Sequence, residues 1–142
     1  QVGGIDCNPI SGEITYGLER LAMFIQEKDN IFDLLWSQNG KSYKDICFQN
    51  EVEQSSYNFN FANIEYIKEE FRMIEDEAQF LVDKKLAFPA YEKCVKASHL
   101  FNLLDARGVL SVSERASYIK RVRDLSKASC QLYMKTLGDR NE

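Results

Sequence analysis

The sequence has few of the residues that build metal sites or disulfide frameworks. Its 142 residues include four cysteines and a single histidine. Cys7, Cys47, Cys94 and Cys130 form no CxxC pair, and only His99 could add an imidazole, so the pattern argues against a zinc site. We therefore predict that the chain builds no metal site and that its cysteines are reduced thiols.

Long apolar runs are also missing. No stretch approaches the roughly 20 apolar residues that a membrane helix needs, and no basic segment followed by an apolar one opens the chain as in a signal peptide. We predict a cytoplasmic protein that does not contact a membrane. The opening residues Gln1–Gly4 lack an initiator methionine and begin as though within an element, which leads us to expect a cleaved or truncated product.

The composition that remains is typical of a globular protein. Hydrophobic residues make up 44% and charged residues 28% of the chain, enough for a packed core and a solvated surface. The formal net charge of −4 is unevenly distributed. Residues 1–110 contain 11 basic and 18 acidic residues, whereas residues 111–142 contain 7 and 4, so the C-terminal part is mildly basic.

The first 60 residues suggest a small amount of sheet. Glu13–Tyr16 has the β-branched and aromatic content of a short strand, and Gly17 separates it from a helical pattern that begins at Leu18. Asn39-Gly40 is a strong hairpin signal that precedes a second strand candidate at Ser42–Cys47. The polar run at residues 49–54 is compatible with either a helix or a loop, and residues 55–62 are the predicted linker.

The rest of the chain predicts three long helices. Apolar residues recur three and four positions apart from Ile64 to Leu81, which is the pattern of a helix with one buried face. Pro89 suits the first turn of a second helix, and Gly108 suits the position after its end. A capping box at Ser111 and Glu114 opens a third helix, and the short loops imply that the three helices are antiparallel.

Arg20 is the most informative residue for function. It lies in the first turn of the predicted helix, where the helix dipole disfavours a cation by about 0.3–1 kcal/mol unless an anion is near. A local carboxylate, Glu13 or Glu19, would satisfy it. A bound phosphate would do so as well, because helix N–H groups and a guanidinium both bind phosphate oxygens and Gly17 permits a close approach of the backbone.

The run Gly17-Leu18-Glu19-Arg20-Leu21 resembles motif 3 of class II aminoacyl-tRNA synthetases. The similarity to one member family, the α subunit of bacterial glycyl-tRNA synthetase, extends over essentially the whole chain. It is carried by residues 1–4, 12–23, 49–59 and 89–119, the last of which contains Asn102–Arg107. This resemblance implies that residues 1–60 form the C-terminal part of a class II catalytic domain and that residues 61–142 form a helical bundle domain.

The fold expected from this reading is mainly α. It combines short strands and the motif 3 helix, taken from a class II catalytic antiparallel sheet, with a C-terminal antiparallel helical bundle. The activity that the resemblance implies is that of a glycine-tRNA ligase, which activates glycine with ATP, together with Mg²⁺, and transfers it to tRNA(Gly). It further implies a second α subunit and a β subunit as partners.

The resemblance also assigns roles to individual residues. Arg20 corresponds to the catalytic arginine that contacts the ATP phosphates, and Gly17 and Glu19 complete the ATP site. Glu13, Thr15 and Gln1 are assigned to glycine binding, with Glu13 and Thr15 filling the pocket so that only glycine fits. Glu13 and Gln1 could equally be structural hydrogen-bonding residues.

Two further expectations limit the enzyme interpretation. Motifs 1 and 2 of the family would lie upstream of Gln1, so this chain alone is expected to be inactive. The alternative to an enzyme is a non-catalytic helical module that docks a partner subunit.

Three basic residues line one face of the last predicted helix: Lys120, Arg123 and Lys127. For this face, exposure to solvent is favoured over binding of phosphate.

Overall fold

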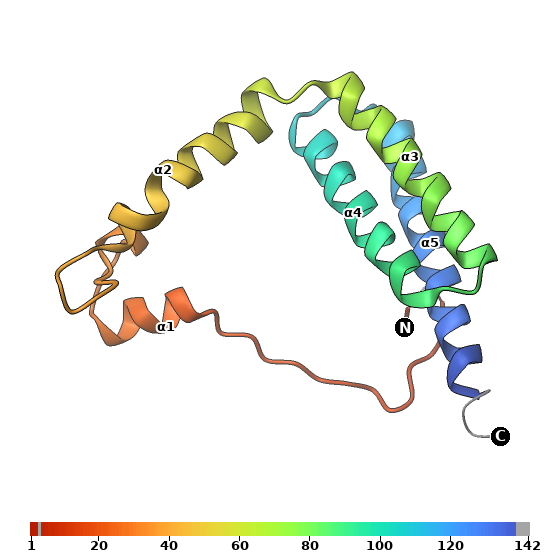
Figure 1. Ribbon diagram of the computed structural model, residues 1–142, viewed down its shortest axis with the longest axis horizontal. Helices are drawn as coiled ribbons and strands as arrows, with labels where there is room; N and C mark the ends of the chain where they lie inside the picture. Colours follow the sequence, from red (N-terminus) through yellow and green to blue (C-terminus); the bar gives the residue numbers. More distant parts are fainter. Residues whose placement is uncertain (3, 139–142) are drawn as a thin grey trace. The chain divides into compact units, whose positions relative to one another are not determined.

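The computed structural model describes residues 1, 2 and 4–138, which form two compact units. Residues 1–10 and 62–142 make up the first unit by sequence, and residues 11–61 make up the second. We call helices α3 to α5 of the first unit the bundle and residues 11–61 the N-terminal unit (Figure 1). In the described part of the chain, no helix is long and apolar enough to cross a membrane.

The bundle consists of α3 (Ile64–Asp83), α4 (Ala87–Ala106) and α5 (Val112–Gly138). The short connections reverse the chain direction twice, so the three helices lie side by side and antiparallel (Figure 1). The apolar stripe expected from Ile64 to Leu81 lies within α3, and it contributes Phe71, which is 0% exposed, to the core. Leu104 of α4 and Leu125 of α5 close the core from the other two helices.

The ends of the bundle helices show why they begin and end where they do. The Asn63 side chain caps α3 by accepting from the backbone N–H groups of Glu65 and Tyr66. Gly108 follows α4 with a φ of 63°, a left-handed conformation that glycine adopts at little cost. The Ser111–Glu114 capping box predicted from sequence is formed, with both of its reciprocal hydrogen bonds present.

An aromatic clamp joins α3 to α5 inside the bundle. The Arg121 guanidinium lies 4.5 Å from the ring centroid of Phe71 and 4.9 Å from that of Tyr118. Its Nε donates to Glu75 Oε1 at 2.8 Å, and a second N–H donates to the other carboxylate oxygen. Because the hydrogen bonds to Glu75 stabilise the charged form, the pKa of Arg121 is raised further above its ordinary value.

The N-terminal unit contains two α-helices and two short helical turns. They are α1 (Leu18–Ile25), the 3₁₀ turn η1 (Ile31–Asp33), α2 (Tyr43–Ser56) and the π-helical turn η2 (Tyr57–Phe61). The polar run at residues 49–54, which was compatible with helix or loop, is helical. Gln26 ties α1 to the following loop, since its amide donates to Leu35 O at 3.1 Å and accepts from Leu35 N at 2.7 Å.

The predicted sheet is not present, so the fold class inferred from the resemblance is wrong. The described residues contain isolated bridges at Val2–Ile5 and Leu35–Ser42 but no strand of a class II catalytic antiparallel sheet. Residues 13–16 have no regular secondary structure and no ladder partner in the described chain, and a strand exists only when its backbone groups pair with another strand.

The second strand candidate, Ser42–Cys47, is also wrong, because this segment begins α2. Ser42 Oγ accepts from Asp45 N at 3.2 Å, and Asp45 accepts from Ser42 N at 2.9 Å, which makes a capping box. The Asn39-Gly40 signal does mark a chain reversal, with Gly40 at a φ of 80°. It leads to the single bridge between Leu35 and Ser42 rather than to a hairpin, because the helix begins immediately after it.

Candidate functional site

The start of α1 is an open helix end. Gly17 occupies the N-cap position with a φ of 78° and supplies no side-chain cap, and the first intrahelical bond runs from Leu21 N to Gly17 O. The N–H groups of the first helical residues therefore have no acceptor within the helix. Nothing lies within 4 Å of where a Cβ on Gly17 would be, so the left-handed backbone alone requires glycine here.

Arg20 lies one residue before Leu21 on this first turn, and its side chain is exposed. It forms no ion pair or hydrogen bond with any residue that the structure describes. The local pairing with Glu13 or Glu19, which was one of the two alternatives raised by the sequence, is therefore not formed. Although Glu19 lies in the same turn, the Arg20 guanidinium has no ion-pair partner among the described residues, an arrangement that favours an anionic ligand.

Glu19 points toward a different feature, a hollow of about 300 Å³ between α1 and the loop that follows it. Trp36 and Tyr43 line the hollow together with Leu18, and Arg20 is not among its lining residues. The pKa of Tyr43 is raised, mainly by its hydrogen bond with the Cys47 thiol and in smaller part by the charge of Glu19. Glu19 and Arg20 thus diverge from the same helical turn.

The three predicted glycine-binding residues divide between the two units. In the N-terminal unit, Thr15 Oγ1 donates to a carboxylate oxygen of Glu13, so these two side chains act as a pair. Gln1 belongs to the other unit, where its amide donates to Asp6 Oδ1 at 2.6 Å. Thr15 holds the Glu13 carboxylate in one orientation and leaves its second oxygen available for another donor.

Sequence reasoning missed the surroundings of α1. Trp36 is 58% exposed and contributes a wall of the hollow beside Glu19, which no pattern in the sequence indicated. Gln26, which positions the Trp36 loop through Leu35, carried no recognisable sequence signal. The described residues contain no group of three or more His, Cys, Asp or Glu side chains arranged to hold a metal ion.

The apolar face of α1 is exposed as well. Leu18, Phe24 and Ile25 are 82%, 84% and 76% exposed, and no residue of this helix is buried. A short helix gains most of its stability from packing an apolar face, and α1 packs little of its apolar face against the described residues.

Comparison with known families identifies the family of the chain. A family model described as glycyl-tRNA synthetase alpha subunit matches residues 1–137, nearly the whole chain. The matched range spans both helices of the N-terminal unit, α3, α4 and all of α5 except its last residue. The chain therefore belongs to the glycyl-tRNA synthetase alpha subunit family and has a role in the synthesis of glycyl-tRNA.

Proposed function

We propose that the chain takes part in the activation of glycine by ATP, with Arg20 as the catalytic residue that contacts the triphosphate. In this step a glycine carboxylate oxygen attacks the α-phosphorus of ATP, the bond to pyrophosphate breaks, and glycyl-adenylate forms. The 3′-terminal hydroxyl of tRNA(Gly) then attacks the glycyl carbonyl, and AMP leaves. The observation that carries the proposal is the unpaired guanidinium at the open start of α1, in a chain of this family.

The chemistry needs positive charge more than it needs a nucleophile. Negative charge grows on the leaving pyrophosphate in the transition state, and a preorganised guanidinium stabilises that charge at little reorganisation cost. The free N–H groups after Gly17 add donors on the same side of the helix end. Mg²⁺ would arrive with ATP, because it is bound mainly through substrate phosphates and water in sites of this kind.

Glu13 and Thr15 are the proposed determinants of amino-acid selection. The Glu13 carboxylate would accept from the glycine ammonium, and Thr15 would hold that carboxylate and occupy the space of a larger side chain. Gln1 is a second proposed ammonium contact, through its side-chain carbonyl, since its amide N–H is already engaged by Asp6. Glu19 is proposed to complete the ATP site from the hollow beside α1.

The partners proposed with this function are a second alpha subunit, a beta subunit, tRNA(Gly) and glycine. The exposed apolar face of α1 is consistent with burial in such an assembly. All of the activity measurements below therefore use the assembled synthetase that contains this chain.

Replacing Arg20 tests the proposal most directly. We expect Arg20→Ala to lower ATP–pyrophosphate exchange by about 10²–10³-fold, as the loss of one stabilising donor does in other enzymes. The KM for ATP should rise more than the KM for glycine. Lys28→Ala, which removes another exposed cation of the N-terminal unit, is the matched control. Exchange within twofold of this control would refute the role of Arg20.

A second experiment addresses selection of the amino acid. If Thr15 fills the pocket, Thr15→Gly should narrow the preference for glycine over alanine by about tenfold or more, because one methyl group in a pocket is worth roughly 10–200-fold. Thr15→Ser keeps a hydroxyl for Glu13 and is the control for orientation. Unchanged selectivity in the exchange assay with Thr15→Gly would exclude the filling role while leaving the ATP proposal intact.

A further inference from the structure

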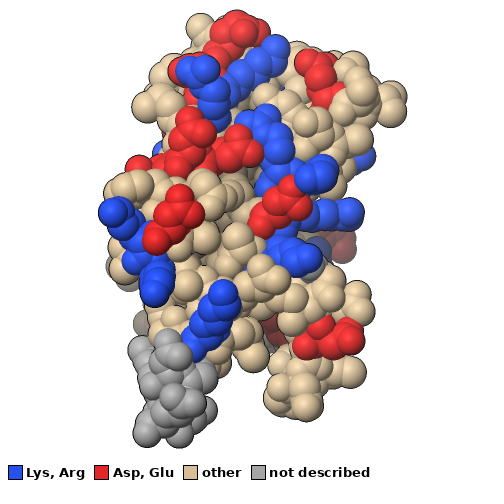
Figure 2. Space-filling view, turned by 90° about the vertical axis from the view of Figure 1, so that its right-hand side faces the viewer, with Lys and Arg blue, Asp and Glu red and all other residues tan. Residues whose placement is uncertain are grey.

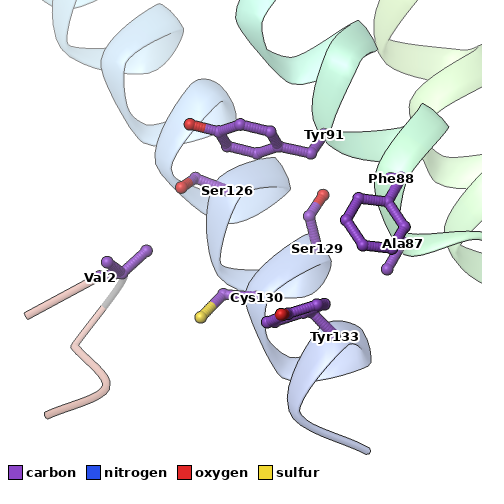
Figure 3. A pocket seen from close by; sticks show the side chains of 8 residues that line it. All are labelled: Val2, Ala87, Phe88, Tyr91, Ser126, Ser129, Cys130 and Tyr133. Carbon is purple, nitrogen blue, oxygen red and sulfur yellow. The ribbon is translucent and has the colours of Figure 1, made fainter. Parts of the chain in front are cut away.

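The surface between α4 and α5 carries a continuous uncharged groove. Two hollows, of about 290 and 380 Å³, lie between these helices, and Tyr91 and Ser126 line both. Figure 3 shows the first of them, which Val2 of the N-terminal segment also lines. From Ala87 to Asn102 the groove follows 15 residue steps of α4, or about 22 Å at 1.5 Å per residue. This is the length of a four-turn helix.

The lining of the groove differs from the rest of the bundle surface. None of the residues that line either hollow is Asp, Glu, Lys or Arg. Phe88, Tyr91 and Val95 lie three and four positions apart along α4 and are 64%, 54% and 53% exposed. By contrast, the face of the molecule in Figure 2 shows Lys and Arg side chains intermingled with Asp and Glu. Depletion of charge and enrichment of exposed aromatic residues are the features of the core of a protein interface.

Basic side chains follow the outer edge of the groove on α5. At 100° per residue, Arg123 and Lys127 lie next to Ser126 and Cys130, on the side turned away from the buried Leu125. Both side chains are exposed, and neither forms an ion pair within the described part of the chain. Lys120, on the same edge, pairs with Asp124 at 2.5 Å. The α5 edge of the groove therefore carries two cationic side chains, Arg123 and Lys127, that have no ion-pair partner in the described part of the chain and lie beside an apolar floor.

We infer that this groove binds one amphipathic helix of a different polypeptide chain. That helix would place apolar residues three and four apart between α4 and α5, and acidic residues along the edge that faces Arg123 and Lys127. The family description names this chain an alpha subunit, which implies another kind of subunit in the assembly. The inference is independent of the ATP chemistry proposed for Arg20.

Two other occupants fit less well. In a two-fold symmetric contact, a second copy of this chain would present the same concave surface, and two grooves cannot fill each other. Nucleic acid is bound mainly through many phosphate contacts with Lys and Arg, whereas the floor of this groove has no such side chain. An amphipathic helix, by contrast, has a convex apolar ridge that can fill this groove.

Photo-cross-linking in the purified assembled enzyme identifies the occupant. Tyr91→p-benzoylphenylalanine places the photoreactive group in the middle of the groove, and Met73→p-benzoylphenylalanine places it on an exposed position of α3. We expect the Tyr91 variant alone to cross-link to one segment of another subunit. The sequence of that segment should have apolar residues three and four apart with neighbouring Asp or Glu. Cross-links to a second copy of this chain, to tRNA, to a segment of other composition, or to nothing beyond the Met73 control would each overturn the inference.

Charge substitutions provide an independent measurement. Val95→Glu buries a carboxylate in the proposed interface and should weaken association of the subunits at least tenfold, whereas Met73→Glu should change it less than twofold. Arg123→Glu combined with Lys127→Glu should weaken association at low ionic strength and much less at high salt. Circular dichroism and ATP binding establish that each variant is folded and that its ATP site is intact. Equal association of the Val95 and Met73 variants would contradict the inference.

Discussion

The two units of this chain differ in how much of their apolar surface they bury themselves. The bundle has a contiguous core in which Phe71 and Leu104 are 0% exposed. Within residues 11–61, all of which the structure describes, Leu34 is the only buried side chain. Phe24, for example, is 84% exposed. The bundle therefore has its own core, whereas the N-terminal unit, which contains all of the proposed functional residues except Gln1, buries little of its apolar surface.

Because of this difference, we expect global stability and ligand binding to depend on different units of the chain. Burial of apolar area is the dominant favourable term in folding, so global stability should depend on the bundle. The open helix end and the unpaired Arg20 belong to the unit with little core. Substitutions there should change ligand binding with little effect on the unfolding of the bundle.

Matched phenylalanine substitutions should give the largest contrast. Phe71→Ala removes a fully buried ring and should destabilise the bundle by about 3–5 kcal/mol. Phe24→Ala removes an exposed ring, and its effect should stay within about 0.5 kcal/mol. Urea denaturation followed by circular dichroism measures both. Similar losses in the two variants would mean that α1 is part of the same cooperative core.

The clamp between α3 and α5 should have the next largest effect. Arg121→Met leaves Glu75 without its partner and removes the cation between two rings, so we expect a loss of about 1–3 kcal/mol. Glu75→Gln should cost less because an amide oxygen can still accept from the guanidinium. A double-mutant cycle isolates the coupling between the two side chains, and a coupling near zero would contradict the clamp.

Two glycines in left-handed conformations provide a smaller contrast. Gly108→Ala should destabilise the bundle by about 1–2 kcal/mol, because the backbone penalty is not accompanied by any clash. Gly17→Ala also carries a backbone penalty, because φ is positive there, but in the unit with little core it should instead lower ATP affinity and leave the thermal midpoint of the bundle nearly unchanged. Calorimetry together with ATP titration of the assembled enzyme distinguishes these two outcomes.

The capping boxes should produce the smallest effects, and these should depend on pH. Ser111→Ala should cost the bundle about 1 kcal/mol, whereas Ser42→Ala should chiefly reduce the helicity of α2. Hydrogen bonds from Ser111 hold the pKa of Glu114 below its ordinary value of 4.5 in the folded state. The stabilisation is therefore complete above that ordinary value and is lost as the pH falls through the lowered pKa. The acid-induced drop in thermal midpoint should be smaller in Glu114→Gln; an equal drop would exclude this contribution.

The sequence predicted the bundle better than the N-terminal unit, for a physical reason. Helices α3 to α5 carry their own signals, such as the apolar stripe through Phe71 and the capping box at Ser111, and their packing partners are one another. A strand at residues 13–16 would need a partner that no local pattern specifies. At Ser42, a readable capping box with Asp45 outweighed the strand propensity of the residues that follow, and it should have been recognised.

The sequence nominated the residues of the candidate site, and their roles stay a prediction, but it did not indicate the surroundings of those residues. The glycine and arginine of the Gly17–Leu21 run signalled an anion-binding helix start, and the open cap and unpaired guanidinium fit that hypothesis. The divergence of Glu19 from Arg20, and the exposure of Trp36, depend on how α1 meets the next loop through Gln26. Such contacts between distant residues leave no periodic trace in a single sequence.

Hydrogen exchange of the assembled synthetase, with and without ATP, tests the central claim most directly. We predict that ATP slows exchange of the amides of residues 18–20, because phosphate oxygens would accept from N–H groups that the helix leaves free. Exchange in the interior of α3, α4 and α5 should be unchanged, and Arg20→Ala should abolish the protection. Protection of the bundle instead, or no protection at the start of α1 under saturating ATP, would contradict the account.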